Sequence, residues 1–348
     1  MYSNVVIFTV GIISANIINV WTINWWSDID NFFEHDNDSY NDYDQKDAKE
    51  TPRSEGITDR SRHFSTTDVN IPPLDTYVAN IIANKVKLLC WIVTCPKFHM
   101  DRAIHIKETW GKRCDILLFM STEDDPRLPT VKLNVPEGTN YLWGKHQAAA
   151  RYIYDHYLHS ADWFLRADDN TYVIVENLKH FLIGYNTYNP IYFGFRMKAI
   201  QAQNGFFSGG AGIVLSREAI TQFVVKGLHN RVCNTSPSGA ADDLDLTICL
   251  DKLGIIPMDS RDQYQRGRFH PFIPEHHIDA TRNDEFWFWK DIYYEISLGR
   301  DCCSEYTISF HYIDKNLMYA LEYFVYHLRP YGISYKHHSN TKLLEFIE

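Results

Sequence analysis

A cluster of acidic residues in the middle of the chain has side chains suited to metal chemistry. Asp168, Asp169 and Asn170 follow the apolar segment 163–165 almost directly. Carboxylates at the end of a strand are hard oxygen ligands for Mg²⁺ or Mn²⁺, and such ions hold diphosphates. The same residue types also favour the start of a helix, where they cap free backbone N–H groups. On this motif alone, the helix cap is the better interpretation.

Three further segments carry candidate functional residues. The small-residue run at 207–212 lets backbone approach a ligand closely, and it also suits a tight turn. Residues 241–244 open a helical stretch, where Asp243 either favours the helix dipole or acts as a general base. His311 is placed to complete a metal site, although a lone His is more often structural.

The elements that must position these residues alternate along the chain. Apolar runs predict buried strands at 87–93, 115–120, 163–165 and 191–193, and helical spacing predicts helices at 101–110, 146–158 and 173–182. This alternation predicts an α/β sandwich with a largely parallel sheet. Ligands of such sheets bind beyond the carboxyl ends of the strands, which is where Asp168 falls.

The composition is that of a folded protein with no general affinity for nucleic acid. The 348 residues are 45% apolar and only 22% charged, which excludes a wholly disordered chain. The net charge of −10 argues against a nucleic-acid partner, because such binding needs a basic face. Much of the charge is local, since residues 28–62 hold 11 acidic and 5 basic side chains.

The beginning of the chain predicts a membrane anchor. Residues 5–26 contain no charged side chain, and 22 residues are enough to cross a hydrocarbon core as a helix. A cleaved signal peptide is the alternative, although the apolar run is long for one and no clear cleavage site follows. We therefore expect a short tail and anchor at 1–26, a disordered acidic stem at 27–76 and a catalytic domain at 77–348.

Taken together, the candidate segments resemble the core 1 synthases, the glycoprotein N-acetylgalactosamine 3-β-galactosyltransferases of glycosyltransferase family 31. The matching segments span roughly residues 87–333: CWIVT, ETWGKRCDILLFMS, ADWFLRADDNTYVIVENL, YFGFR, SGGAGIVLS, HPFIPEHH, FWFW, CCS, SFHYID and MYALEYFVYHLRPYG. The ADD and SGGAG motifs indicate the wider β1,3-transferase superfamily. The EFWFW segment, the Cys pair and LEYFVYHLRPYG point to the core 1 branch.

The resemblance implies a fold, a reaction and a location. The fold is a GT-A-type, Rossmann-like nucleotide-sugar transferase domain in a single-pass type II Golgi membrane protein, with the catalytic domain in the lumen. UDP-galactose is the implied donor, Mn²⁺ the cofactor, and glycoproteins carrying GalNAc on Ser or Thr the acceptors. The implied reaction transfers galactose to O3 of GalNAc with inversion, which forms the core 1 O-glycan (T antigen). A homodimer is implied as well.

The match to the family's motifs also assigns roles to individual residues. It implies Asp168, Asn170 and His311 as metal ligands and Asp243 as the catalytic base. Nucleotide-sugar binding is assigned to Thr94, Glu137, Gly138, Lys145, Asp169 and Tyr312, and acceptor binding to Trp287, Trp289, Gly209 and Gly210. The family implies disulfides Cys90–Cys114, Cys233–Cys249 and Cys302–Cys303, which leaves Cys95 as the odd thiol.

One position departs from the family pattern. Asn170 stands where the family normally has a third Asp, and an amide oxygen brings no negative charge to a metal, so we expect weaker Mn²⁺ affinity. This departure leaves an inactive, chaperone-like paralogue as an alternative. A fringe-type β1,3-N-acetylglucosaminyltransferase is a separate alternative, against which the EFWFW and LEYFVYHLRPYG segments argue. Galactosyl transfer is preferred because Asp168, Asp243, Trp287 and His311 are all present.

Overall fold

The computed structural model describes residues 76–279 and 286–330. These residues belong to the compact unit Pro73–Glu348. The predicted anchor, and all but the last residue of the predicted stem, lie outside the described residues. Within the described ranges, no helix has the length and apolar character needed to cross a membrane.

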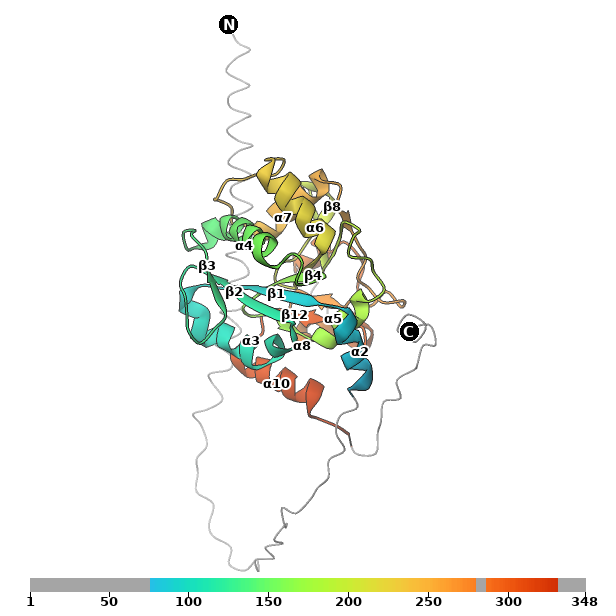
Figure 1. Ribbon diagram of the computed structural model, residues 1–348. Coiled ribbons are helices and arrows are strands. Elements are labelled where there is room, and N and C mark those ends of the chain that lie inside the picture. The colour runs from blue at the N-terminus through green and yellow to red at the C-terminus, as the bar shows by residue number, and fades with distance from the viewer. Residues whose placement is uncertain (1–75, 280–285, 331–348) are drawn as a thin grey trace, which may run out of the picture. The chain divides into compact units, whose positions relative to one another are not determined.

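A mostly parallel sheet forms the centre of this unit (Figure 1). In spatial order its strands are β10 (Ile256–Pro257), β6 (Ile191–Phe193), β9 (Ile213–Ser216), β4 (Trp163–Asp168), β1 (Leu88–Val93), β2 (Ile116–Ser121) and β3 (Thr130–Lys132). Neighbouring strands are parallel, except that β9 runs antiparallel to both β4 and β6. Every residue of β1 is buried, which is typical of a strand covered on both faces.

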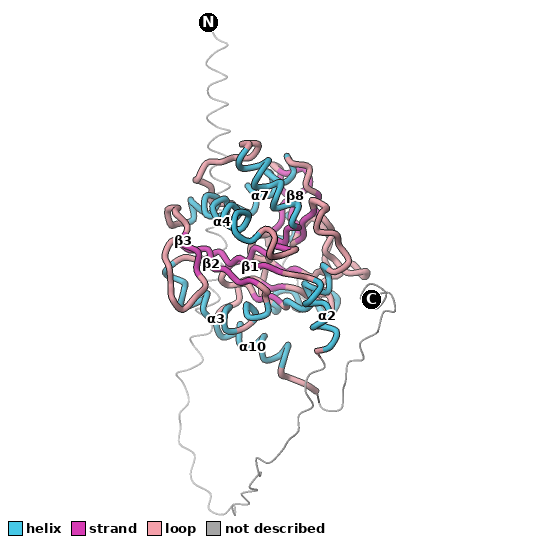
Figure 2. Tube along the Cα trace, viewed as in Figure 1, coloured by secondary structure: helices cyan, strands magenta, loops and turns pink. Residues whose placement is uncertain are grey.

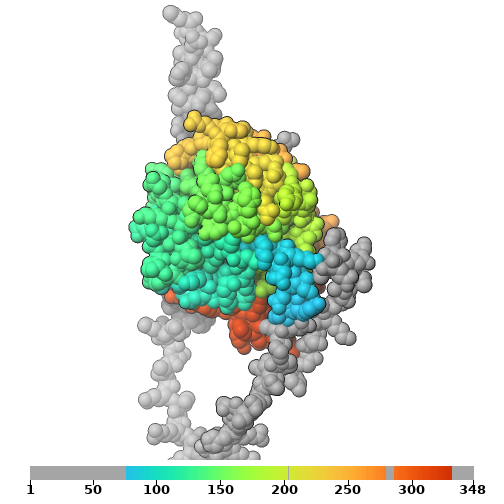
Figure 3. Space-filling view, in the orientation of Figure 1, coloured from blue at the N-terminus to red at the C-terminus, as the bar shows by residue number. Residues whose placement is uncertain are grey.

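Helices cover the two faces of the sheet (Figures 1 and 2). One face carries α4 (Leu142–Tyr157), α6 (Arg217–Gln222) with the π-helical turn Phe223–His229, and α7 (Asp242–Lys252); the other carries α2 (Tyr77–Lys85), α3 (Ile104–Glu108), α5 (Val175–Leu182) and α10 (Lys315–Tyr326). On the α4 side, Trp91, Trp143 and Phe164 belong to one buried core. On the other side, α10 packs against α3, and the two segments lie along one face (Figure 3).

Shorter elements bring the later part of the chain to the end of β4. The strands β11 (Phe269–His270), β12 (Ser309–Phe310) and β5 (Tyr172–Val173) form a second sheet, and the strands β7 (Arg196–Ala199) and β8 (Ala202–Phe207) form a hairpin; α8 (Pro274–Ile278) and α9 (Phe288–Asp291) are short helices. In the β12–β5 pair, Ser309 lies opposite Val173 and Phe310 opposite Tyr172. Because β5 begins just after Asn170, this antiparallel register places His311 beside the acidic turn.

The structure contains all the predicted strands and helices, with some ends shifted. The helix predicted at 146–158 begins at Leu142, and the helical segment predicted at 101–110 is a π-helical turn at His99–Ala103 followed by α3. Val173, predicted as helical, lies in β5, and α5 begins only at Val175. The predicted alternation fails between residues 191 and 216, where β6 to β9 follow one another with no helix between them.

The disulfides implied by the resemblance are confirmed. The structure contains Cys90–Cys114, Cys233–Cys249 and Cys302–Cys303, and Cys95 is the free cysteine among the described residues. The first bond ties β1 to the segment before β2, and the second ties α7 to the loop after the Phe223–His229 turn.

Candidate active site

Asp168 ends β4 at the carboxyl edge of the sheet, as the sequence predicts. One carboxylate oxygen, Oδ1, lies 2.8 Å from Nη1 of Arg166. The other, Oδ2, lies 3.6 Å from Nε2 of His311. The structure therefore brings together two of the predicted metal ligands, one from the end of β4 and one from the residue after β12.

A backbone hydrogen bond connects the segment that carries His311 to Asn170. The carbonyl oxygen of Asn170 accepts a hydrogen bond from the N–H of Ile313 at 2.8 Å. Burial lowers the pKa of His311 to about 4, because desolvation disfavours the imidazolium. The ring is therefore neutral at pH 7, with a lone pair that can bind a cation.

Asp243 lies in the first turn of α7, where its carboxylate has a fixed orientation. Oδ2 accepts the N–H of Gly209 at 3.1 Å, and Oδ1 accepts the N–H of Leu244 at 2.8 Å. Burial raises the pKa of Asp243, and the adjacent charge of Asp242 raises it further. An oriented carboxylate with a raised pKa is suited to take a proton from a hydroxyl group.

The neighbouring Asp242 is buried and belongs to a separate network. Its Oδ2 lies 2.8 Å from Nη2 of Arg166 and 3.2 Å from Nδ1 of His146. Burial opposes the ionisation of this carboxyl, but the charge of Arg166 and the bond to His146 outweigh it and hold the pKa of Asp242 below its usual range. Asp168, Arg166, Asp242 and His146 thus form one continuous chain of contacts.

The small-residue run packs directly on this chain. A Cβ added at Gly209 would lie 2.6 Å from Nη1 of Arg166, and one added at Gly210 would overlap the ring of His311. The small residues predicted either a close approach of backbone to a ligand or a tight turn. The tight turn is confirmed, since the N–H of Gly212 donates to the carbonyl of Gly209 at 2.9 Å. The space beside Gly209 and Gly210 is occupied by the side chains of Arg166 and His311.

The residues assigned to the nucleotide form a network beyond the ends of β1 and β4. Thr94 Oγ1 donates to Asp169 Oδ2 at 2.8 Å. Lys145 Nζ donates to the carbonyl of Thr94 at 2.9 Å and to both carboxylate oxygens of Glu137 at 2.9 and 3.0 Å. Gly138 follows with φ +113°, a conformation that favours glycine. Five of the six predicted nucleotide residues therefore lie in one cluster.

Asp169 and the sixth residue, Tyr312, lie next to the metal ligands. Burial raises the pKa of Asp169 to about 6, and this effect outweighs the opposing charge of Arg102, whose Nη1 lies 3.3 Å away. Tyr312 adopts φ +58° and its ring centroid lies 4.0 Å from that of His311. Asp169 directly follows Asp168, and Tyr312 directly follows His311, so both residues adjoin the predicted metal ligands.

The tryptophans assigned to the acceptor belong to an aromatic cluster. Trp287 and Trp289 are partly exposed, and Phe288 between them is buried. Phe288 packs on Phe272 with ring centroids 5.0 Å apart, and Phe272 stacks near Tyr312 at 6.1 Å. The aromatic segment is therefore connected to the metal side of the site through Phe272.

The donor atoms at the end of β4 suit a divalent cation shared with a diphosphate. Bonds of about 2.1 Å allow two ligand atoms up to about 4.2 Å apart, and the 3.6 Å between Asp168 and His311 meets this limit. Among the described residues, no group of three or more His, Cys, Asp or Glu side chains could hold a metal ion. Further ligands must come from the amide of Asn170, from water or from phosphate oxygens, as is common for Mg²⁺-type ions.

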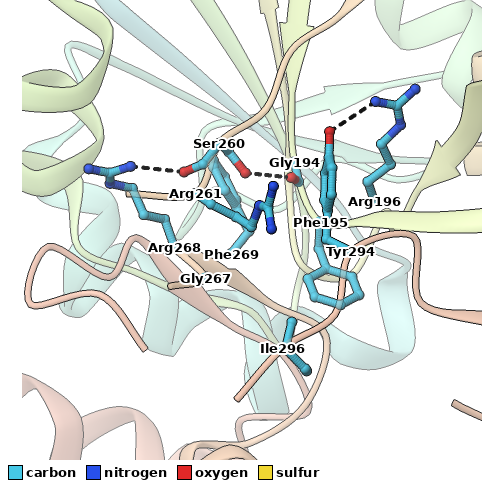
Figure 4. Close-up of a pocket in the computed structure, with 10 residues that line it drawn as sticks. All are labelled: Gly194, Phe195, Arg196, Ser260, Arg261, Gly267, Arg268, Phe269, Tyr294 and Ile296. Atoms are coloured by element: carbon cyan, nitrogen blue, oxygen red, sulfur yellow. Dashed lines mark hydrogen bonds between the residues drawn. The ribbon is translucent and has the colours of Figure 1, made fainter. Parts of the chain in front are cut away.

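A hollow elsewhere in the unit is not lined by these residues. It lies between Phe195, Phe269 and Tyr294, and three arginines line it (Figure 4). Each arginine has a partner: Arg268 donates to the carbonyl of Ser260 at 3.0 Å, Arg196 to the hydroxyl of Tyr294 at 3.1 Å, and Arg261 to Asp259 at 2.8 Å. Neither Asp168 nor Asp243 lines this hollow.

Sequence reasoning missed Arg166, Asp242 and His146. The available signal was Arg166, which is a charged residue inside the otherwise apolar strand segment WFLRA. A buried charge is retained in a strand only when it is paired. Its partner Asp242 lies in the segment 241–244, where sequence analysis singled out only Asp243, and nothing local to the sequence indicates His146.

Comparison with known proteins finds a matching family model and several related glycosyltransferases. The model of the Fringe-like family matches residues 83–341. The chain is 43% identical to glycoprotein-N-acetylgalactosamine 3-beta-galactosyltransferase 1 of Xenopus laevis over 76% of this chain and 73% of that protein. It is 28% identical to a beta-1,3-glucosyltransferase of Mus musculus over 55% of this chain and 40% of that one. It is 25% identical to chondroitin sulfate synthase 3 of Homo sapiens over 47% and 20% of the respective chains.

These similarities agree with the architecture. The mixed α/β unit with its central sheet is consistent with a GT-A-like glycosyltransferase domain. The family match covers most of the chain and includes β4, α7 and β12, which carry the candidate site. The chain belongs to the Fringe-like family, within glycosyltransferase family 31.

Proposed function

We propose that this protein transfers galactose from UDP-galactose to O3 of GalNAc linked to Ser or Thr of glycoproteins. The product is the core 1 O-glycan, and the anomeric centre is inverted. The observation that carries this proposal is the 43% identity to the Xenopus galactosyltransferase over three quarters of the chain. The arrangement of Asp243 and Asp168 supports it, because an inverting transfer needs a base for the acceptor and a separate site for the leaving diphosphate.

In this proposal Asp243 acts on the acceptor. Its carboxylate takes the proton of the GalNAc O3 hydroxyl as that oxygen attacks the anomeric carbon of galactose. The new C–O bond forms on the face opposite to the bond that breaks, so an α-linked donor gives a β-linked product. The bonds from the N–H groups of Gly209 and Leu244 keep the carboxylate oriented during this step.

The donor half of the site holds the nucleotide and its diphosphate. Asp168, His311 and the amide of Asn170 are the residues that would hold Mn²⁺. When bound, such an ion neutralises the charge that the diphosphate gains as the sugar leaves. Lys145, Asp169 and Thr94 are proposed to contact the nucleotide, and their mutual hydrogen bonds keep this side rigid.

The proposal is tested with a panel of UDP-sugars on a GalNAc-threonine peptide. UDP-galactose should be used in preference to UDP-N-acetylglucosamine and UDP-glucose, and the product should carry a β1,3 linkage by NMR. A preference for UDP-N-acetylglucosamine would favour the fringe-type alternative. Binding of UDP with no transfer from any donor would favour the inactive, chaperone-like alternative.

We also propose that the protein is a single-pass type II protein of the Golgi membrane, with residues 1–26 as the anchor, and that it forms a homodimer. The uncharged run at 5–26 supports the anchor. The disulfides support a lumenal domain, because such bonds persist in oxidising compartments. Light scattering of the soluble domain tests the dimer, and a monomer mass across micromolar concentrations would contradict it.

A further inference from the structure

Arg166 is a buried cation in the middle of the central sheet. It lies in β4, which pairs with β1 on one side and β9 on the other, and its side chain is only 3% exposed. A guanidinium in such a place is costly unless its charge is balanced. Asp168 and Asp242 balance the charge of Arg166, although among the described residues only Nη2 makes a hydrogen bond, and Nε and Nη1 make none.

The two ends of the guanidinium hold carboxylates from different elements. Nη1 lies 2.8 Å from Oδ1 of Asp168 at the end of β4, and Nη2 lies 2.8 Å from Oδ2 of Asp242 at the start of α7. A planar guanidinium has two separate nitrogen-bearing ends, so it can pair with two carboxylates at once. Here Nη2 donates a hydrogen bond to Asp242, and Nη1 makes an ion pair with Asp168 that lacks hydrogen-bond geometry. The single ammonium of a lysine has no such pair of ends.

Each carboxylate leads to a different half of the proposed site. Arg166 occupies Oδ1 of Asp168 and leaves Oδ2 facing His311 at 3.6 Å. Asp242 immediately precedes Asp243 in the first turn of α7. On top of the guanidinium lies Gly209, whose N–H donates to Asp243, and the close approach leaves no room for a Cβ there.

We propose that Arg166 is a positioning residue that fixes the metal-binding carboxylate of Asp168 in place relative to the catalytic base Asp243. It orients Asp168 directly, and it orients Asp243 through Asp242 and through the Gly209 backbone packed on it. This inference rests on the proposed function, because it assigns the two carboxylates their roles from that reaction. The new element is the role of Arg166, a side chain of the central sheet that connects the donor side of the site to the acceptor side.

The two contacts of Arg166 can be separated by measurement. Asp242→Asn keeps the shape of the side chain and, of the two ion pairs of Arg166, weakens only the one that leads to Asp243; it also weakens the contact of Asp242 with His146. It should lower kcat by about tenfold at saturating donor and leave the affinity for UDP with Mn²⁺, measured by calorimetry, within about twofold of wild type. Arg166→Met removes both contacts, so it should lower kcat by about a hundredfold and weaken UDP binding by about tenfold.

A double-mutant cycle tests whether Arg166 acts through Asp242. If it does, the combined variant Arg166→Met/Asp242→Asn should have the kcat of Arg166→Met alone, because the second change removes nothing further. It also spares the fold a buried carboxylate at position 242 that has lost its arginine. Losses in kcat that multiply would overturn the coupling, and so would wild-type kcat in Asp242→Asn.

A matched control separates positioning from general stability. Arg113 on the opposite face is also a largely buried arginine, and it is bidentate to Glu322 at 2.7 and 3.0 Å. Arg113→Met should lower the melting temperature but keep kcat and UDP affinity per folded molecule. Equal losses of UDP affinity in Arg113→Met and Arg166→Met would refute a specific role for Arg166.

The binding measurement also separates this inference from the proposed function. Wild-type protein that binds UDP with Mn²⁺ but transfers no galactose would defeat the proposed function. The comparison of UDP affinities between Arg166→Met and Asp242→Asn would still decide the Asp168 half of the inference, and equal affinities in these two variants would overturn it.

Discussion

At the scale of single residues, the proposed chemistry depends on two carboxylates in different electrostatic surroundings. Asp242 is held ionised by Arg166 and His146, whereas Asp243 next to it has only backbone N–H donors and a raised pKa. Charge on one member of the pair makes the other a better base. The adjacent positions 242 and 243 therefore have different tasks, although the sequence shows the same residue type at both.

Replacing Asp243 by Asn tests the base directly. The substitution keeps the shape and removes the basic oxygen, so turnover should fall by about a hundredfold or more. The affinity for UDP should stay unchanged, because Asp243 lies on the acceptor side. A steady-state assay with calorimetry measures both quantities, and a variant that transfers galactose at the wild-type rate would show that the base is another residue.

The raised pKa of Asp243 also predicts a pH dependence. As pH falls, Asp243 becomes protonated and loses its basic form, and a raised pKa places this loss well above the usual value near 4. At saturating Mn²⁺ and donor, the kcat of the wild type should therefore decrease as pH falls. The decrease should begin at a pH where an ordinary aspartate, with its pKa near 4, is still ionised. Residual activity of Asp243→Asn should lack this acid limb. Identical profiles for the two proteins would argue against the assignment.

Residue 170 determines how many charges the chain offers to a metal ion. Asn170→Asp adds an anionic oxygen next to Asp168 and His311, so half-saturation by Mn²⁺ should occur at a lower concentration, with activity unchanged or higher. The measurement is a Mn²⁺ titration of UDP binding and of transfer. An unaltered Mn²⁺ requirement would show that residue 170 is not a ligand.

At the scale of elements, the site depends on the fit of the loop 207–212 against β4 and β12. Gly210→Ala would place a methyl group on the ring of His311, which must then move away from Asp168. We expect metal-dependent UDP affinity to fall by at least about tenfold. Gly184→Ala is the control, since nothing lies within 4 Å of a Cβ there and UDP affinity should not change. Normal UDP affinity in Gly210→Ala would contradict this packing.

The disulfide between Cys90 and Cys114 connects β1 to the segment that leads into β2. It closes a loop with a sequence separation of 24 residues. In the chain-entropy model, loss of a bond of this kind costs about 3 kcal/mol of unfolding free energy. Urea denaturation of Cys90→Ala/Cys114→Ala measures the cost. Peptide mapping without reduction gives a direct check, and free thiols at these positions would refute the pairing.

Sequence alone could predict the parts of this fold that depend on local patterns. The apolar segments gave β1, β2, β4 and β6, because burial on both faces selects continuous apolar residues. The direction of β9 could not be predicted, since its run IVLS is equally apolar in a parallel or an antiparallel neighbour. The position of Asp168 follows from the end of an apolar strand, and so it was predictable.

The roles of Arg166 and His311 depend on contacts that no local pattern contains. His311 reaches Asp168 only because β12 pairs with β5 in one particular register. The proposed role of Arg166 depends on its hydrogen bond to Asp242, which lies 76 residues further along the chain. The family resemblance predicted His311 as a metal ligand, but nothing in the sequence predicted the contacts of Arg166 with Asp168 and Asp242.

At the scale of the whole molecule, the proposed anchor gives a direct experiment on the full chain. Residues 1–26 should keep the protein in the membrane pellet after carbonate extraction, because an uncharged span of this length is stable in the bilayer. A version that begins at residue 27 should be released into the supernatant. Full-length protein recovered in the soluble fraction would contradict the anchor, and N-terminal sequencing would reveal a cleaved signal peptide.

The sheet formed by β5, β12 and β11 also has a consequence for synthesis of the protein. It joins chain segments made at very different times, since Val173 in β5 lies opposite Ser309 in β12. While the ribosome is still adding residues before 300, β4 can already pair with β1, but His311, which lies 3.6 Å from Asp168 in the folded protein, has not yet been synthesised. A chain released early can therefore contain the central sheet without His311. If the proposed metal site is correct, chains that terminate before residue 311 should not capture UDP-galactose, which a binding assay on such truncated chains would check.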